Sequence, residues 1–228
     1  MADQIGNYFV NNLRAVYVSL VNDDGFVGLS RLANAIGVIP MSKGSYYNHA
    51  NKIYELCTKF YNVNLTKAHQ DVKDFFQRNY NLCPIYENGE YLDIAVSLDG
   101  TYAHTGHFSR FGASFVVEAL TGRILDMNVL EKCFKCPNHM DYSSHGTCPQ
   151  KLFHGCSGSM EVENAKLLFK NSKKLGFRYT TYIADGDNKV YPKLRELNIY
   201  PIEKTECANH FTKRAKKKNK KIWRDLYW

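Results

Sequence analysis

The chain has 228 residues, of which 44% are hydrophobic, and its formal net charge is +8. This length suits one large domain or a domain with an appendage, and the composition is that of a globular protein with a sizeable core. No run of 18 apolar residues occurs, and the first twelve residues lack the basic-then-apolar pattern of a secretory signal. We therefore expect no membrane-spanning helix.

The positive charge is concentrated at the C-terminal end of the chain. Residues 211–228 hold eight Lys or Arg and one Asp, whereas the remainder is close to neutral. A basic tail suits a phosphate backbone through counterion release, and it is equally typical of a solvated charge run or a nuclear-import signal. The chain has seven Cys, an odd number, and no signal peptide. This favours a reducing compartment, in which the cysteines are free thiols or metal ligands and not a disulfide framework.

Residues 1–85 are expected to form a helical N-terminal region. Ser42 is a suitable N-cap for a long helix that runs toward Tyr80, and residues 81–90 read as a linker. Such a region is either a DNA-reading module or a helical bundle that supports the next domain. Apolar residues recur at helical spacing in two earlier segments: Phe9, Leu13, Val16 and Leu20, then Leu29, Leu32, Ala33 and Ile36.

Residues 86–228 read as a second domain of mixed type. Three strands followed by alternating helices and strands predict a mixed sheet flanked by helices, in the strand order of ribonuclease-H-like folds. In that order the first and fourth strands are parallel neighbours. Residues 121–123 (Thr-Gly-Arg) predict a hairpin turn, and Gly176 is a fitting helix C-cap. Strands are expected over 94–98, 114–120, 124–130, 179–184 and 199–202, and helices over 159–175 and 189–197.

Two Asp-Gly dipeptides each follow a β-rich run, at Asp99 and at Asp185. In the predicted sheet both lie at the C-terminal tips of neighbouring strands, so we expect their carboxylates to meet at one end of the sheet. Carboxylate oxygens bind Mg²⁺ or Mn²⁺, and such cages are the core of phosphoryl-transfer sites. Asp187 would share a face with Asp185 and is a further candidate. The alternative is that both dipeptides are ordinary turns.

Residues 131–158 form a Cys- and His-rich insertion. Two pairs with two-residue spacing, Cys133 with Cys136 and His145 with Cys148, can supply four tetrahedral zinc ligands. The alternative is a loop of free thiols. Further donors in the same segment leave the ligand set ambiguous: His139, His154 and Cys156.

Several polar residues near the predicted sheet end have two interpretations. Glu161 and Glu163 open the second-domain helix, where carboxylates complement the helix dipole; a catalytic role is the alternative. Arg110, with His104 and His107, lies just past the first carboxylate and either contacts DNA phosphates or belongs to a polar loop.

An ordered set of motifs resembles the Mutator-like transposase domain of eukaryotic mobile elements. The stretch from Gly28 to Tyr46 is also similar to the helical lead-in of that family. The resemblance covers nearly the whole chain. The motifs are Asp99-Gly-Thr-Tyr, Gly106-His-Phe-Ser, Thr121-Gly-Arg-Ile-Leu-Asp126, Gly158-Ser-Met-Glu-Val-Glu163, Arg178-Tyr-Thr-Thr-Tyr-Ile-Ala-Asp-Gly-Asp187 and Ile202-Glu-Lys-Thr-Glu-Cys-Ala-Asn-His210.

The resemblance implies a ribonuclease-H-like core of the three-carboxylate type, in which two metal ions activate water or a DNA 3′-hydroxyl. Asp99 matches the first carboxylate and Asp185 the second, while Cys207 and His210 match a Cys-x2-His element of the family. The third carboxylate of the family lies well after that element, where this sequence offers only Asp225. The expectation is therefore a fragment or a decayed copy.

The sequence thus predicts a nuclear, transposase-like DNA-binding protein with a partial Mg²⁺- or Mn²⁺-dependent site for phosphodiester cleavage and strand transfer. A structural zinc loop and a homo-oligomer are part of this expectation. The alternative is a non-catalytic, transposon-derived DNA-binding module, which leaves open whether the chain is an enzyme. Candidate DNA contacts are Arg110, Lys213, Arg214, Lys216, Lys217 and Lys218.

Overall fold

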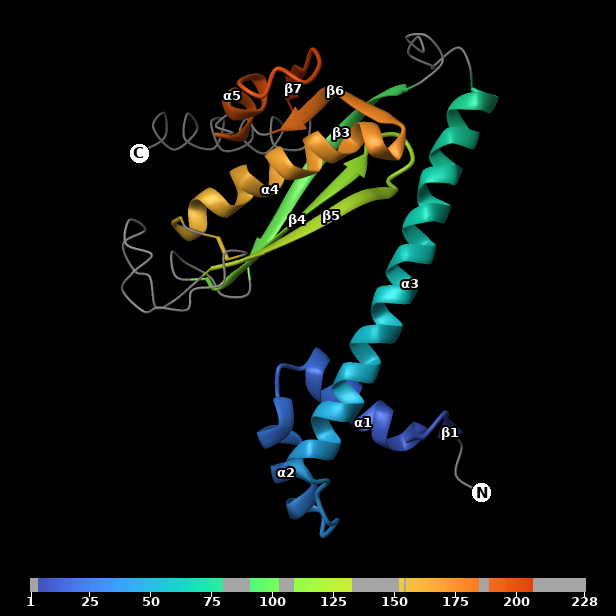
Figure 1. Ribbon diagram of the computed structural model, residues 1–228, viewed down its shortest axis with the longest axis vertical. Coiled ribbons are helices and arrows are strands. Elements are labelled where there is room, and N and C mark those ends of the chain that lie inside the picture. The colour runs from blue at the N-terminus through green and yellow to red at the C-terminus, as the bar shows by residue number, and fades with distance from the viewer. Residues whose placement is uncertain are drawn as a thin grey trace, which may run out of the picture. The chain divides into compact units, whose positions relative to one another are not determined.

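The structure is a computed structural model that describes residues 4–79, 91–102, 109–132, 152–153, 155–184 and 189–206. The chain forms two compact units, residues 1–66 and residues 67–228, which are considered separately (Figure 1). The boundary between them falls within a long helix, α3 (Lys43–Arg78).

The first unit is helical, as predicted, apart from a small antiparallel pair of strands at its start. The Oγ atom of Ser42 accepts the backbone N–H of Ser45 at 3.2 Å, so the predicted N-cap of α3 is confirmed. A small apolar core holds the helices together through Leu13, Val16, Tyr46, Ala50 and Ile53. The elements are β1 (Gln4–Ile5), β2 (Tyr8–Phe9), α1 (Val10–Val21), α2 (Gly25–Ala35) and the first part of α3.

The second unit is built on a five-stranded mixed sheet with the order β5-β4-β3-β6-β7. Strands β3, β4 and β5 form an antiparallel meander, whereas β6 lies parallel to both β3 and β7. This arrangement confirms the predicted fold class, including the parallel pairing of the first and fourth strands of the unit. The strands are β3 (Leu92–Tyr102), β4 (Phe111–Glu118), β5 (Ile124–Glu131), β6 (Phe177–Ala184) and β7 (Glu203–Glu206).

The predicted hairpin turn connects β4 to β5, and a buried carboxylate stabilises it. Glu118 is fully buried, and its carboxylate accepts the N–H of Leu120 at 3.0 Å and the N–H of Thr121 at 2.6 Å. The hydroxyl of Thr121 donates a third hydrogen bond at 2.6 Å. Gly122 adopts a φ of +66°, a conformation that favours glycine.

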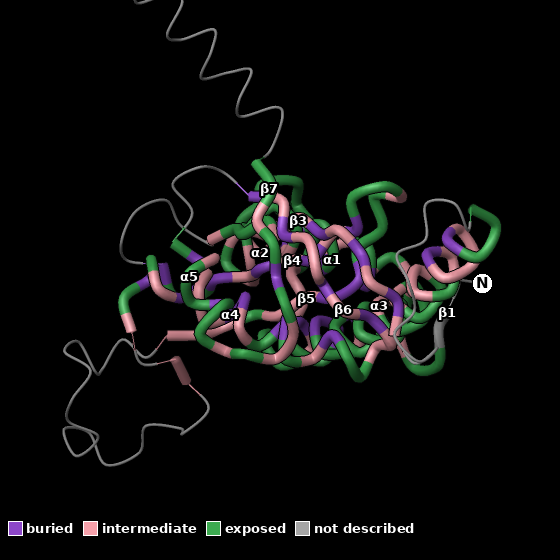
Figure 2. Tube along the Cα trace, turned by 90° about the horizontal axis from the view of Figure 1, so that it is seen from above, coloured by how far each residue is buried: buried purple, intermediate pink, exposed green. Residues whose placement is uncertain are grey.

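Helix α4 (Ser157–Asn171) lies across one face of the sheet in Figure 1, and a 3-10 turn (Ser172–Leu175) follows it. Along the first part of β3, buried residues alternate with partly exposed ones, because successive side chains of a strand point to opposite faces of the sheet (Figure 2). Phe169 is fully buried and meets Tyr179 and Tyr182 edge to face, with centroids 5.2 and 5.8 Å apart. Gly176 has a φ of +84°, so the predicted C-cap is confirmed.

The C-terminal part of α3, within the second unit, completes the core of that unit. Val72 and Phe76 are almost fully buried in the cluster that also holds the sheet residues. The ring of His69 is 2.6 Å from the carbonyl oxygen of Leu125, and Arg123 pairs with Asp71 at 2.9 Å. This part of α3 is therefore fastened to the β4–β5 hairpin.

The fifth strand was expected in the wrong place. Residues 199–202 are not a strand; β7 occupies Glu203–Glu206, and the short helix α5 (Val190–Arg195) precedes it. Ile199 and Tyr200 pack against the core, and Ile202 is 8% exposed. This segment is a connection whose apolar side chains pack into the core. In the sequence, a buried connection and a short buried strand have the same apolar composition.

Candidate functional site

Asp99 lies within β3, three residues before the strand ends, and it pairs with Phe115 of β4. The prediction that it marks the tip of the strand is wrong, because pairing with β4 continues to Tyr102 opposite Gly112. The pairing of β3 with β6 stops earlier, at Ser97. The residues that follow β6, 185–188, lie outside the described residues, so no partner of Asp99 at this edge of β3 is described.

The Asp99 side chain is exposed at this edge. Its Oδ1 accepts the backbone N–H of Gly100 at 2.9 Å, which holds the carboxylate close to the strand. Within the described ranges no hydrogen bond to the other oxygen, Oδ2, is present. A carboxylate with one oxygen held and one turned to solvent is suited to binding a cation.

The register of β3 against β6 is fixed by a two-fold ion pair. Arg178 of β6 lies directly opposite Asp93 of β3, and its Nε and Nη2 atoms each donate to one carboxylate oxygen at 2.5 Å. Both side chains are largely buried, with 13% and 16% exposed. A bidentate pair of this type specifies geometry as well as charge, so it sets which residues of the two strands lie side by side.

The second predicted carboxylate follows β6 in the chain, but its position is not described. The last described residue of β6 is Ala184, and Asp185 and Asp187 lie outside the described residues. The same holds for Cys207 and His210, which follow β7, and for the linker predicted over 81–90. The remaining predicted ligands and contacts outside the described residues are Cys133, Cys136, His145, Cys148, Lys213, Arg214, Lys216, Lys217 and Lys218.

Glu161 of α4, for which the sequence offers a catalytic role only as the alternative to a helix-dipole role, lies over the same segment of β3. A methyl group on Gly100 would be 3.6 Å from Cγ of Glu161 and 3.5 Å from Oγ of Ser114. Ser114 of β4 is the strand partner of Gly100. Because glycine has no side chain, Glu161 can approach the backbone of Gly100, next to Asp99. No spacing in the sequence signals this contact, because it depends on how α4 crosses the sheet.

Tyr102, at the end of β3, lies near the start of α4. Its ring packs closely enough on Gly112 that a methyl group there would be 3.3 Å from Cε1 of Tyr102 and 3.0 Å from Sδ of Met160. Burial, with a smaller contribution from the Glu161 carboxylate, raises the pKa of Tyr102. The phenol therefore stays protonated around neutral pH.

Cys156 is the one predicted spare zinc donor that the structure describes. It lies at the N-cap position of α4 with an exposed thiol, 3.5 Å from the hydroxyl of Ser159. The Ser159 hydroxyl bond lowers the pKa of Cys156 more than burial raises it, and backbone N–H groups at the start of α4 add to this effect. The thiol is thus more acidic than an ordinary cysteine.

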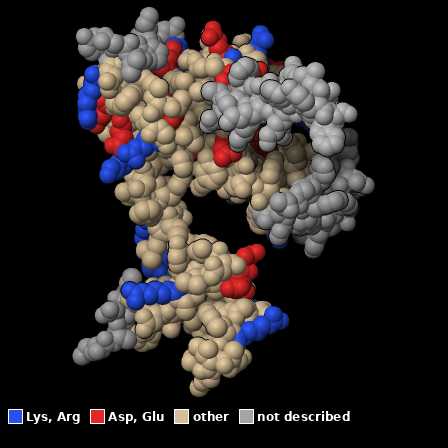
Figure 3. All heavy atoms as spheres, turned by 180° about the vertical axis from the view of Figure 1, so that it is seen from behind, with Lys and Arg blue, Asp and Glu red and all other residues tan. Residues whose placement is uncertain are grey.

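Arg110 is engaged by Glu131 on the neighbouring strand β5. Its Nε donates to Oε1 of Glu131 at 2.9 Å, and its Nη2 contacts the same oxygen. The Arg110 side chain is nevertheless half-exposed, at 51%. On the face shown in Figure 3, basic and acidic side chains of the described residues are interspersed and do not gather into one basic surface.

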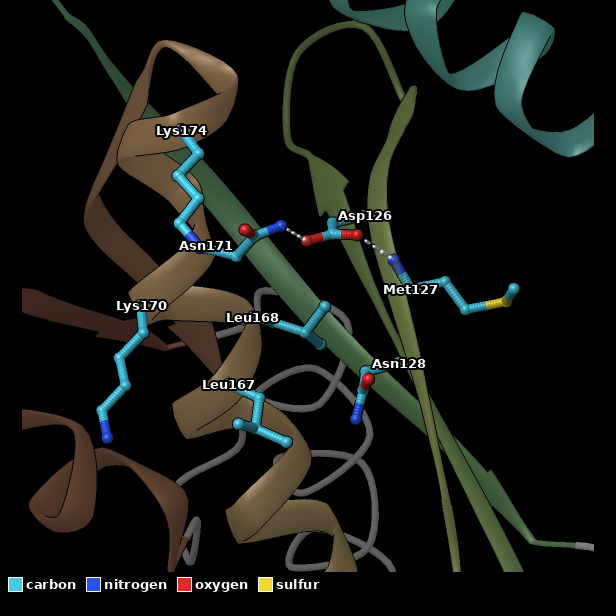
Figure 4. Close-up of a pocket in the computed structure, with 8 residues that line it drawn as sticks. All are labelled: Asp126, Met127, Asn128, Leu167, Leu168, Lys170, Asn171 and Lys174. Carbon is cyan, nitrogen blue, oxygen red and sulfur yellow. Dashed lines mark hydrogen bonds between the residues drawn. The ribbon is translucent and has the colours of Figure 1, made fainter. Parts of the chain in front are cut away.

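A polar groove of about 350 Å³ lies between α4 and β5 (Figure 4). Asp126 is its buried carboxylate: Oδ2 accepts the side-chain N–H of Asn171 at 2.9 Å, and Oδ1 accepts the N–H of Met127 at 2.8 Å. Both carboxylate oxygens are thus engaged inside the protein. None of the predicted site residues lines this groove, so it is not the candidate site.

Across the described ranges, no three or more His, Cys, Asp or Glu side chains converge as a metal site would require. The described helices include none with the length and apolar character needed to cross a bilayer.

The described part of the candidate site consists of Asp99 and the backbone of Gly100 beside it, with two side chains close to that glycine. These are Glu161 of α4 and Ser114, the strand partner of Gly100.

The model of one protein family, Mutator-like transposase, matches residues 5–225 of this chain. The match runs through both units. Comparison with curated proteins and with solved structures gave no match.

Proposed function

Because the chain belongs to the Mutator-like transposase family, we propose that it binds DNA and uses Asp99 and Asp185 to hold Mg²⁺ or Mn²⁺ for phosphodiester cleavage and strand transfer. The family assignment supports transposase-like activity and interaction with DNA. The observation that carries the choice of residues is the parallel register of β3 against β6, whose last described pair, Ser97 with Ile183, lies two residues before Asp99 and Asp185.

The strand register supports bringing the two carboxylates together. The last β3–β6 pair is Ser97 with Ile183, and the Asp93–Arg178 pair holds this register. Continuing it by two residues on each strand would place Asp185 beside Asp99. Parallel neighbours end at the same edge of a sheet, which is the arrangement that a two-carboxylate cation site needs.

The residues fit the cation by donor type. Asp99 presents a hard carboxylate oxygen to solvent, and Mg²⁺ is typically held by one or two carboxylates together with waters and substrate phosphates. When bound, such a cation supplies Lewis-acid stabilisation of charge on the phosphate. The protein's own contribution is positional: the Gly100 N–H and the β4 pairing fix the Asp99 carboxylate. In this proposal Asp187 and His210 lie nearby and orient the reacting groups.

The DNA is held by other parts of the chain in this proposal. The basic tail, residues 211–228, neutralises phosphates, and the half-exposed Arg110 side chain adds a further contact. Cys133, Cys136, His145 and Cys148 bind a structural zinc ion. In this proposal the protein acts on DNA in the nucleus, as a homo-oligomer.

The test is cleavage of supercoiled plasmid with Mn²⁺ by the wild type and Asp99→Asn. We expect nicking that Asp99→Asn reduces at least a hundredfold, because one ligand of the cation loses its charge. Asp24→Asn, at an exposed carboxylate of the first unit, is the control and should cleave as the wild type does. Equal cleavage by Asp99→Asn and wild type would refute the proposed site.

The second candidate is a DNA-binding module without catalysis. It is favoured by the concentration of positive charge in residues 211–228, which suits DNA binding and needs no cation site. This candidate predicts salt-dependent DNA binding without Mn²⁺-dependent cleavage, and binding that Asp99→Asn leaves unchanged. A gel-shift titration beside the plasmid assay separates the two candidates.

A further inference from the structure

We propose that two copies of this chain form a symmetric dimer through an apolar patch at the C-terminal end of α2. The patch consists of Leu32, Ile36, Val38 and Ile39 and is called the α2 patch below. The inference rests on the proposed function only in its homo-oligomer, for which it names the contact surface. It involves neither the cation nor the DNA.

The α2 patch is exposed although its side chains are apolar. In the order named, its residues are exposed at 59%, 66%, 54% and 92%. Most of the other large apolar side chains that are exposed among the described residues also belong to the first unit. Four aliphatic side chains at these exposures offer on the order of 300 Å² of apolar area, the size at which an exposed patch indicates an interaction site.

A helix end of defined geometry holds the patch together. Its first two residues are four positions apart and are therefore neighbours on the surface of α2. Gly37, with a φ of +73°, then reverses the chain. Its N–H donates to the carbonyl of Asn34 at 3.2 Å, and the N–H of Val38 donates to the carbonyl of Ala33 at 2.9 Å. These two bonds form a Schellman motif, which turns Val38 back beside the last turn of the helix. Met41 packs against the core, so the segment is anchored beyond the patch as well.

The internal contacts of α2 come from other residues. Phe26 and Leu29 pack against the small core of the first unit, and the rings of Phe26 and Tyr46 meet edge to face with centroids 5.6 Å apart. No residue of α2 is buried. One copy of the chain therefore positions the α2 patch without covering it.

The charge pattern favours a second copy of the chain as the occupant. Arg31 is the only charged residue between Gly25 and Ser42. In a symmetric dimer a surface meets its own copy, so several like charges within it would repel one another across the interface. The α2 patch contains no charged residue and avoids this repulsion. The same lack of cations makes a phosphate backbone a poor occupant.

The size of the first unit favours a permanent partner. Its core has five buried residues, and a unit of 66 residues buries a smaller share of its apolar surface than a large domain does. Oligomerisation is a common source of additional burial for small folds. Interfaces of permanent homodimers are more apolar than transient ones, as the α2 patch is. A second copy is present wherever the chain is, so it can cover the patch continuously.

The experiment is sedimentation equilibrium of the full chain, without DNA or divalent cation, for the wild type, Ile39→Glu and Val63→Glu. Ile39 is the most exposed residue of the patch, so one copy tolerates a charge there. We expect a wild-type dimer at about 10 µM. Ile39→Glu should weaken it at least a hundredfold, because symmetry places two carboxylates in one apolar interface. Circular dichroism confirms that each variant is folded.

Val63→Glu is the matched control. Val63 is an apolar residue of the same unit with 69% exposure, and it lies about 30 Å along α3 from the start of that helix. This variant should dimerise as the wild type does. A monomeric wild type would overturn the inference and leave another part of the chain or a different protein as the occupant. A dimer that Ile39→Glu leaves intact, or that Val63→Glu weakens equally, would overturn it too.

A mixture of two charged variants tests the symmetry. The patch is small, so each of its residues lies close to the two-fold axis and near its own copy. Ile39→Glu and Ile39→Lys should each be monomeric, whereas an equimolar mixture should form a heterodimer. A mixture that stays monomeric would refute the symmetric contact. Asp99→Asn should dimerise as the wild type does, so failure of this interface and failure of the proposed cation site are measured independently.

Discussion

The Asp93–Arg178 pair should make a large, measurable contribution to the second unit, because it joins β3 to β6 with two charge-assisted hydrogen bonds. Each such bond is worth about 1.5–3 kcal/mol, and removing one partner of a buried pair costs about 3 kcal/mol because the other charge is left unpaired. We therefore expect Asp93→Ala and Arg178→Ala each to destabilise the unit by about 3 kcal/mol and the double variant by about 4 kcal/mol. The implied coupling energy is about 2 kcal/mol.

The assay is hydrogen exchange of β3 and β6 amides as a function of urea, which reports opening of this unit alone. With a urea dependence of about 2 kcal/mol per molar, each single variant should shift its midpoint by about 1.5 M. The control cycle uses Lys193 and Glu196, an exposed pair at 49% and 61%, whose coupling should stay below about 0.5 kcal/mol. A coupling for Asp93 and Arg178 no larger than that of the control would refute the reasoning.

Two further predictions concern the start of α4. Gly112→Ala should destabilise the second unit by about 1–3 kcal/mol, because its methyl group would be 3.0 Å from Met160, whereas Gly100→Ala, with nothing closer than 3.5 Å, should cost less than 1 kcal/mol in the same urea measurement. Cys156 should be alkylated by iodoacetamide faster than the exposed Cys57 at pH 7, since its lowered pKa gives more thiolate at a given pH, and Ser159→Ala should slow it. Mass spectrometry of the two peptides measures both rates, and equal rates would contradict the proposed role of the Ser159 hydrogen bond.

The sheet was largely predictable because its signals are local. The alternation of buried residues in β3 and β4 follows from strand geometry, and it is visible in the sequence. The glycines of the β4–β5 turn and of the C-cap at Gly176 are visible too, because both have a positive φ that favours glycine. The segment 199–202 was wrongly predicted as a strand, because its composition reflects burial and not backbone conformation. Ile202 is apolar because the core needs its side chain, and a buried connection carries the same composition as a short strand.

The candidate site was predictable only in part. Asp99 was found because an Asp-Gly after an apolar run is visible in one strand. The proximity of Glu161 to Gly100 was not, because it depends on the angle at which α4 crosses β3, and several alignments of the helix would satisfy the same pattern of apolar residues. Among the described residues the buried hydroxyl of Ser114 has no hydrogen-bond partner, which is likewise a property of packing and has no counterpart in the sequence.

One irregularity of the sheet makes the effect of a change in chain length depend on where in β6 it falls. Between Ile94 and Ala95 the register against β6 shifts, so that Tyr179 and Thr181 face adjacent β3 residues and Thr180 is the extra residue. The buried positions shift with it, from Phe177 and Tyr179 before Thr180 to Tyr182 and Ala184 after it. Deleting Thr180 would therefore remove the bulge and leave each later residue of β6 opposite the same β3 partner and on the same face. Deleting Ile183 would instead bring Ala184 opposite Ser97 and reverse its face. Loss of a single codon is thus compatible with the register at one position of β6 and disrupts it a few residues later.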